Sequence, residues 1–221
     1  MENTTNETNV NEIKGGEKKG KKSKGLLIVV WIMFVALIGL FGVFLYSRRK
    51  TLEEDLGGFT TRFSFQTNAN QDINALIITY LSATASSDQA ILKSCVTDPS
   101  QFDDMSVIQE QSKIITSYSN INCYSVEGKN PNETVVYAVA NISIAGISST
   151  PLDMLGPYYI VKDGNQYLID NRELSPDIQK YMSKVEKDED IQELYGTVKN
   201  DEDAKAAADP AFKEFLDKLN N

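Results

Sequence analysis

The stretch YYIVKDGNQYLIDN, residues 158–171, decides the fold expected for this chain. Apolar and aromatic residues flank Asp163-Gly164, and an Asp-Gly pair in such a setting predicts a β-hairpin. The pair suits a two-residue type I′ turn or a three-residue loop with a bulge, and these differ in whether Tyr158 or Tyr159 faces inward. The sequence does not choose between them. Because its apolar residues are of types that fill protein cores, we expect the hairpin to pack against a hydrophobic core rather than to line a reaction chamber.

Upstream of the hairpin, the period of the apolar residues changes from that of strands to that of helices. Segments 121–128 and 134–147 predict two further strands, with a loop at 151–157. Before them, apolar residues at helical spacing predict three helices. The first begins at Asp72, the second follows a cap at residues 86–88, and the third begins at Asp103 or Asp104. Their inward residues are expected to be Ile73, Leu76, Ile77, Tyr80 and Leu81; Ile91, Leu92, Cys95 and Val96; and Met105, Ile108, Ile115 and Tyr118.

Three helices followed by four antiparallel strands indicate an α+β domain in which helices pack on one face of a curved sheet. With its late hairpin, residues 158–171, this order resembles the NTF2-like superfamily. That family has a cone-shaped α+β fold whose final strands commonly read aromatic, aliphatic, Lys, acidic, Gly, then aromatic-x-Ile. The resemblance covers residues 71–171, and it implies a cone of helices on a curved antiparallel sheet.

Downstream of the hairpin, the sequence predicts a helical C-terminal segment. Ser175-Pro176 is typical of a capped helix start, a second helical face begins at Ile191, and Asp209-Pro210 opens a last helix. The acidic runs 186–190 and 201–203 are interpreted as solvated linkers. The last helix has an apolar face that we expect to dock on this chain or, alternatively, to bind a partner. That face consists of Phe212, Phe215, Leu216 and Leu219.

Upstream of these elements, Leu26 to Leu45 form a tract of 20 residues without charge or proline. At about 1.5 Å per residue this tract spans roughly 30 Å, the hydrocarbon thickness of a bilayer. No small-x-small cleavage site follows, so we expect an uncleaved signal anchor. Six lysines precede it within about 15 residues, whereas Arg48, Arg49 and Lys50 follow it, which favours a cytoplasmic N-terminus.

The net charge of the chain changes sign across this tract. Residues 1–50 carry a balance of +5 and residues 51–221 a balance of −14. A strongly acidic folded region repels phosphates, so we expect no nucleic-acid partner, and the lipid bilayer is the first expected partner. The predicted organisation is a disordered cytoplasmic tail (1–24), a transmembrane helix (25–46), a juxtamembrane linker (47–70), an NTF2-like extracytoplasmic domain (71–174) and a helical C-terminal segment (175–221).

The residue types argue against catalysis. The chain has no histidine, which excludes Ser-His-Asp and Cys-His centres and imidazole zinc sites. It has no glycine-rich phosphate loop and no calcium-loop spacing, so we expect no enzyme, no cofactor and no metal. Some NTF2-like enzymes use an Asp base and a Tyr donor, and the resemblance offers Asp153, Asp170, Tyr80 and Tyr137. None of the four lies in a matching motif, so no catalytic role is carried over.

Two cysteines, Cys95 and Cys123, fall on the predicted outer side. An oxidising compartment would allow them to pair, since two cysteines permit one intramolecular connectivity. Two buried free thiols are the equal alternative.

The predicted function is a single-pass membrane protein that displays a non-catalytic interaction or assembly module in the cell envelope, of a Gram-positive bacterial type. Its layout is similar to that of assembly components of conjugative and type IV secretion machines. An envelope protein is the expected partner, and a helix-in-groove contact is one means of binding it. The alternative is a small-molecule or peptide sensor that uses the cone as a pocket lined by Tyr80 and Tyr137.

Overall fold

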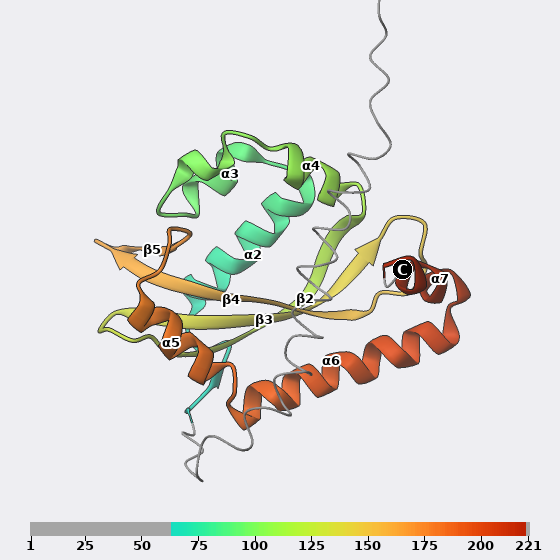
Figure 1. Cartoon of the computed structure of the whole chain (residues 1–221). Coiled ribbons are helices and arrows are strands. Elements are labelled where there is room, and N and C mark those ends of the chain that lie inside the picture. Colours follow the sequence, from blue (N-terminus) through green and yellow to red (C-terminus); the bar gives the residue numbers. More distant parts are fainter. Residues whose placement is uncertain (1–62, 220–221) are drawn as a thin grey trace, which may run out of the picture.

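The computed structural model describes residues 63–219 of the chain, and the structural statements below concern that range. Its helices and strands follow one another as Figure 1 labels them. In chain order they are β1 (Gln66–Thr67), α2 (Gln71–Ser86), α3 (Gln89–Ser94), the 3₁₀ turn η1 (Pro99–Phe102), α4 (Ser106–Ser112), β2 (Ile115–Glu127), β3 (Glu133–Ile144), β4 (Leu152–Asp163), β5 (Gln166–Ile169), α5 (Pro176–Val185), α6 (Glu189–Ala208) and α7 (Pro210–Leu219).

The strands form a five-stranded antiparallel sheet in the order β1-β2-β3-β4-β5. Each strand therefore pairs with its neighbour in sequence, and β3 lies in the middle. There Ala138 pairs with Cys123 of β2 on one side and with Leu155 of β4 on the other. The expected α+β class with an antiparallel sheet is confirmed.

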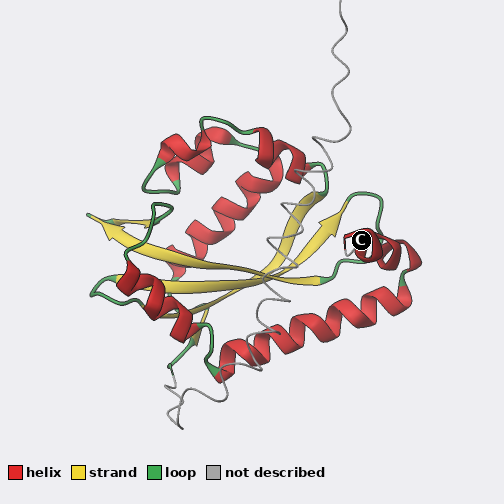
Figure 2. Cartoon of the chain, in the orientation of Figure 1, coloured by secondary structure: helices red, strands yellow, loops and turns green. Residues whose placement is uncertain are grey.

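Helices cover both faces of this sheet, whereas the sequence predicted helices on one face. Helices α2, α3 and α4 lie on one side of the sheet and α5 and α6 on the other (Figures 1 and 2). The first side encloses a core around Ile77 of α2, and the second encloses a core around Ile191 of α6. Consistent with burial on both faces, residues 135–140 of β3 are all buried. A strand covered on both sides needs a continuous apolar run instead of an alternating one.

The first two predicted helices are confirmed, and so is the cap predicted at residues 86–88; the cap of the first helix was not predicted. The Asn70 side chain accepts hydrogen bonds from the first-turn amides of α2, and the Asp88 side chain caps α3. Such caps satisfy amides that have no partner within the helix. Ile91, expected on the inward face of α3, is instead 39% exposed.

The third predicted helix is wrong over its second half. Helix α4 ends at Ser112, and β2 begins at Ile115. The segment from Ile115 to Ser119 alternates Ile, Ser and Ser with Thr and Tyr, and its β-branched and aromatic residues favour a strand. Ile115 and Tyr118 are also three residues apart, a spacing that fits one face of a helix, and this led to the wrong prediction. At the start of α4 an Asp104 carboxylate oxygen accepts from the Ser106 amide at 2.8 Å.

The hairpin is confirmed, with a two-residue connection. Asp163 pairs with Gln166, so the connecting residues are Gly164 and Asn165 and not Asp163-Gly164. Gly164 has a φ of +59°, the conformation that glycine adopts at the first position of a type II′ turn. Tyr158 and Tyr159 both pack inward, but on opposite faces of the sheet. Both tyrosines therefore face the interior: Tyr158 faces the core under α2, and Tyr159 faces the core under α5 and α6.

Strand β4 begins at Leu152, where the sequence predicted a loop as far as Pro157. Its pairing with β3 is interrupted by a bulge between the pairs Val136–Tyr158 and Ala138–Leu155. Gly156 lies in this bulge with a φ of +104°, and a β-carbon there would lie 2.9 Å from a backbone oxygen of β3. The bulge thus requires glycine and bends the strand while both of its faces stay covered.

The fold begins before Gln71, inside the segment expected to be a linker. Strand β1 pairs with β2, and Phe63 and Phe65 pack against the core under α5 and α6. The Phe63 amide donates to a carboxylate oxygen of Asp188 at 2.8 Å. Asp188 also caps α6, so one buried carboxylate joins the first described residues to the C-terminal helices.

The C-terminal helices pack on the domain. Ser175 caps α5 with Pro176 at its first position, as predicted. The run 201–203 lies within α6 and is not a linker. Asp201 accepts the Leu152 amide at 2.7 Å and Asp209 accepts the Ser149 amide at 3.0 Å. These carboxylates cover backbone amides in and beside β4 that the sheet leaves unpaired.

In the described range, no helix has the length and apolarity needed to cross a bilayer. The predicted transmembrane helix, 25–46, and the predicted tail, 1–24, lie outside the described residues.

Candidate functional site

Three tyrosines and one aspartate from α2, β2 and β4 gather on the α2 side of the sheet. We call Tyr80, Tyr118, Asp153 and Tyr158 the Tyr–Asp153 cluster. The Tyr80 and Tyr158 rings meet edge to face with centroids 5.8 Å apart. Tyr118 receives a weak hydrogen bond at 3.5 Å from Gln111 at the end of α4. All four members are partly buried, so each keeps some contact with solvent.

The strand register explains why these side chains share one face. Asp153 pairs with Ala140 of β3, and Tyr118 pairs with Ile142 two residues further on. Paired residues on neighbouring strands point to the same side of a sheet, and residues two apart on one strand do too. The β3 residues on this face are Val136, Ala138, Ala140 and Ile142, so two alanines lie in the middle of the row. Their small side chains leave the larger polar ones to fill this part of the face.

Asp153 is the titratable group that distinguishes the cluster. Burial raises the pKa of its carboxyl to about 6, the Met154 backbone amide lowers it, and the nearby Glu202 carboxylate of α6 raises it further. None of these groups is a cation. No ion pair within residues 63–219 includes Asp153. The carboxylate is therefore largely ionised at neutral pH without a compensating positive charge.

The phenols around Asp153 stay protonated. Burial, and then the charge of Asp153, raise the pKa of Tyr118. Burial also raises the pKa of Tyr158, with smaller effects from Tyr80, Tyr118 and Asp153. The cluster therefore presents neutral aromatic rings and hydroxyl groups beside one carboxylate. Such a set recognises charge and hydrogen-bond donors, but it holds no activated nucleophile.

The predicted pocket pair, Tyr80 and Tyr137, is not brought together. Tyr80 belongs to the α2 side, while Tyr137 lies on the opposite face of β3 in the core under α5 and α6. Tyr137 is fully buried, and its hydroxyl has no hydrogen-bond partner among the described residues. Burial is the main cause of its raised pKa, and the nearby Tyr195 and Glu186 raise the pKa further. It is a core residue of the filled face.

The two cysteines are free and buried. Of the two alternatives left by the sequence, the structure has the unpaired one. Burial raises the pKa of Cys123 to about 11, and burial likewise raises that of Cys95. Both thiols are therefore protonated at neutral pH, which makes them poor nucleophiles.

The apolar face predicted on the last helix packs toward this chain. Phe212 is 2% exposed, and its ring stacks on that of Phe215 with centroids 6.3 Å apart. Phe215, Leu216 and Leu219 are partly buried. Intramolecular docking, the first of the two alternatives, is the arrangement observed.

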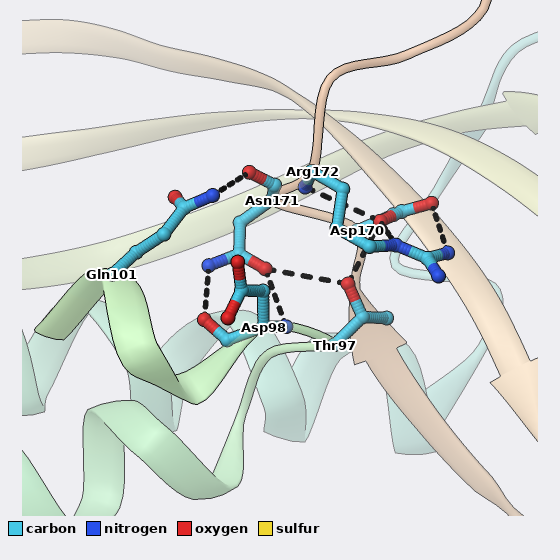
Figure 3. Close-up of polar contacts among 6 residues, drawn as sticks. All are labelled: Thr97, Asp98, Gln101, Asp170, Asn171 and Arg172. Atoms are coloured by element: carbon cyan, nitrogen blue, oxygen red, sulfur yellow. Dashed lines mark hydrogen bonds and ion pairs between the residues drawn. The ribbon is translucent and has the colours of Figure 1, made fainter.

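A second polar group, shown in Figure 3, ties the end of β5 to the segment after α3. The Asn171 side chain donates to the Asp98 carbonyl and accepts from the Asp98 amide, both at 2.8 Å. Asp170 accepts from Thr97 at 2.7 Å and forms a two-point ion pair with Arg172 at 2.7 and 2.9 Å. The hydrogen bonds to Arg172 lower the pKa of Asp170. These groups already have partners, so the network holds the end of β5 against the segment after α3. The Asp170 carboxylate is occupied by Thr97 and Arg172 and is therefore not a candidate base.

A shallow open depression of about 440 Å³ lies beside α4 and is lined mostly by polar residues. They are Gln89, Asp103, Asp104, Met105, Ser106 and Gln109. Asp103 is ion-paired with Lys93 and Asp104 holds the Ser106 amide. The carboxylates therefore serve the local structure. No group of residues within 63–219 has the composition and spacing to hold a metal ion.

The sequence analysis placed Tyr80 inward and named Asp153 as a candidate without a matching motif, and it did not predict that Tyr118 and Tyr158 belong to the same site. Assigning Tyr118 to a helix and Asp153 to a loop removed both from the sheet face. The signal that could have joined them is the continuation of β2 back to Ile115 and of β4 back to Leu152.

Comparison with known proteins gives no match: no family model, no curated protein and no solved structure is similar to this chain at a significant level.

Proposed function

We propose that this chain is a single-pass membrane protein whose described domain is displayed outside the cytoplasm as a non-catalytic interaction or assembly module of NTF2-like type. The proposal joins the uncharged tract Leu26–Leu45 to the acidic domain that follows it. The antiparallel sheet with α2 packed across it supports the NTF2-like part. The lysines before the tract support a cytoplasmic N-terminus.

The observation that carries the interaction role is the Tyr–Asp153 cluster. Its rings and carboxylate converge on one face and stay partly exposed, although the sheet beneath them is buried. Tyrosine is enriched at protein interfaces because it combines a large apolar ring with a hydroxyl group. Proton transfer near neutral pH would further need a partner acid or base poised for it, and the phenols here have raised pKa values. Recognition is therefore the better use of this site.

Photocrosslinking in cells tests the interaction role. A photoreactive p-benzoylphenylalanine at position 118 places the probe in the cluster, and one at position 165 places it in the exposed β4–β5 loop. We expect position 118 to give a discrete crosslink to an envelope protein and position 165 to give none. Crosslinks to lipid and to other copies alone, from position 118, would contradict the proposal.

The sensor remains the second candidate, because the same cluster could serve a small ligand instead of a protein. It predicts no protein crosslink from position 118. It also predicts that a small solute raises the melting temperature of the purified chain, since a ligand that binds only the folded state stabilises it.

Protease accessibility tests the proposed placement. An epitope tag after Asn221 should be removed by protease added to intact cells and protected only after the topology is inverted by moving the lysines. Protection of the tag in intact wild-type cells would reverse the orientation.

A further inference from the structure

The Tyr–Asp153 cluster has a charge that nothing in the described chain balances. The charge of Asp153 acts on the phenols of Tyr118 and Tyr158, and on that of Tyr195 of α6. The charged group that acts on Asp153, Glu202, is of the same sign. Lys199 of α6 is ion-paired with Glu202 and Asp203, at 2.7 and 2.8 Å. A partly buried carboxylate without a counter-ion is costly, and a cation brought by another molecule would remove that cost.

The aromatic groups around Asp153 favour the same kind of ligand. The face of a tyrosine ring attracts a cation through its quadrupole, and the attraction strengthens as water is excluded. Three tyrosines share the α2 side of the sheet with this carboxylate, and two of their rings are 5.8 Å apart in an edge-to-face arrangement. Aromatic rings combined with a carboxylate are a known means of holding ammonium groups. An anion would meet both Asp153 and a domain whose balance is −14 over residues 51–221.

We infer that the Tyr–Asp153 cluster is a binding site for an alkylammonium group, held by the Asp153 carboxylate and the rings of Tyr80, Tyr118 and Tyr158. This inference rests on the proposed interaction function and names the chemistry that the site recognises. The group can come from a lysine side chain of a partner or from a free amine, because both present the same ammonium on an alkyl chain. A neutral chain of the same length fits the rings but leaves the carboxylate unpaired.

Titration of the purified full chain in detergent or nanodiscs tests the inference. The probes are n-butylammonium, the isosteric neutral n-butanol, and the blocked dipeptide acetyl-glycyl-lysine amide, with NMR of ¹³C-labelled tyrosine rings as the readout. We expect n-butylammonium to bind saturably and at least about tenfold more tightly than n-butanol. Tighter binding of the dipeptide than of n-butylammonium would identify a lysine of a partner as the source, and the reverse order would identify a free amine.

Matched variants locate the binding to Asp153. Asp153→Asn keeps the shape of the side chain and should weaken n-butylammonium binding at least about tenfold. Asp163→Asn removes an exposed carboxylate from the same strand and should leave binding unchanged. If Asp153→Asn does not fold, the wild-type chain gives the same information through pH. Lowering the pH from about 7.5 to about 5 protonates a carboxyl with a pKa of about 6 and should weaken the binding.

Equal binding of n-butylammonium and n-butanol, or unchanged binding in Asp153→Asn, would overturn the inference, as would the absence of saturation in the wild-type chain. None of these results removes the interaction function, because a crosslink from position 118 would still show a partner at this face. Conversely, saturable amine binding without any crosslink would keep the inference and favour the sensor.

Discussion

The two faces of strand β3 differ although they belong to one strand. Toward α5 and α6 it presents Val135 and Tyr137, which lie in a fully enclosed core. Toward α2 it presents Val136, Ala138 and Ala140, beside which Tyr118 and Asp153 remain partly exposed. The first face is filled with large side chains. The second has small residues in its centre and polar groups around them. Both sides carry a buried core, and the larger one lies on the α2 side; in the proposal above, only the part of that side around Tyr118 and Asp153 serves recognition.

The largest effect should come from a cavity on the filled face. Ile191 of α6 is fully buried, so Ile191→Ala removes buried methyl groups and should lower the free energy of unfolding by about 2–5 kcal/mol. Denaturant unfolding measures the loss, and the exposed Asn200→Ala on the same helix should stay within about 0.5 kcal/mol of wild type. If folded Ile191→Ala also lost its affinity for n-butylammonium, the proposed separation of roles between the two sides of the sheet would be wrong.

The next effect concerns the link between the first described residues and the filled face. Asp188 is 4% exposed, caps α6 through the Asp190 amide at 3.0 Å and accepts the Phe63 amide at 2.8 Å. Asp188→Ala leaves both amides without this acceptor and should cost about 2–3 kcal/mol.

Hydrogen exchange provides the measurement for Asp188→Ala. Amide protection should fall in the first turn of α6 and at Phe63, while the α2 side keeps its protection. Equal loss of protection on both sides of the sheet would show that the two faces unfold as one unit.

The sequence predicted the parts of this arrangement that depend on local signals. The caps at Asp88 and Ser175 were predicted because a polar side chain precedes an apolar period, whereas the Asn70 cap was not predicted. The second covered face was missed because it depends on which helix returns to the sheet, and residues near Ile191 carry no signal for that. The continuous apolar run 135–140 did contain the information, since a strand with one solvated face would alternate.

The site was harder to predict than the fold for a physical reason. Its members come from three elements, and their convergence depends on register, so an error of a few residues in where β2 begins removes Tyr118. The absence of an ion pair at Asp153 among the described residues likewise depends on which charges the fold brings near it, and spacing in the sequence does not reveal that.

On the α2 side of the sheet, Asp153 should reduce stability in its ionised form. Its folded pKa of about 6 lies above the ordinary value, so the folded chain binds the proton more tightly than the unfolded chain. Stability from this group is then present below the unfolded pKa and is lost as the pH rises through about 6. Asp153→Asn should therefore raise the free energy of unfolding near pH 7 by about 1–2 kcal/mol and flatten its change between about pH 4 and 7.

Thermal unfolding over that pH range measures the effect of Asp153→Asn, and Asp163→Asn serves as the control. A variant that is more stable but binds n-butylammonium less well would fit a residue kept for function at a cost in stability. Loss of stability at neutral pH would instead make Asp153 part of the structural core, and the contrast between the faces would disappear.

The smallest effect compares two tyrosines on the filled face. The Tyr137 hydroxyl is buried without a partner among the described residues, whereas the Tyr159 hydroxyl donates to Glu133 and accepts from the Lys129 amide. Removing a buried group that lacks a partner is neutral or favourable, while removing a bonded one costs about 0.5–1.5 kcal/mol or more. Tyr137→Phe should thus leave stability unchanged or raise it by up to about 1 kcal/mol, and Tyr159→Phe should lower it by about 1 kcal/mol.

Denaturant unfolding of both variants side by side gives the difference. A loss of stability in Tyr137→Phe equal to that in Tyr159→Phe would mean that the Tyr137 hydroxyl has a partner, so that the filled face is not a purely apolar support for the face that carries Asp153.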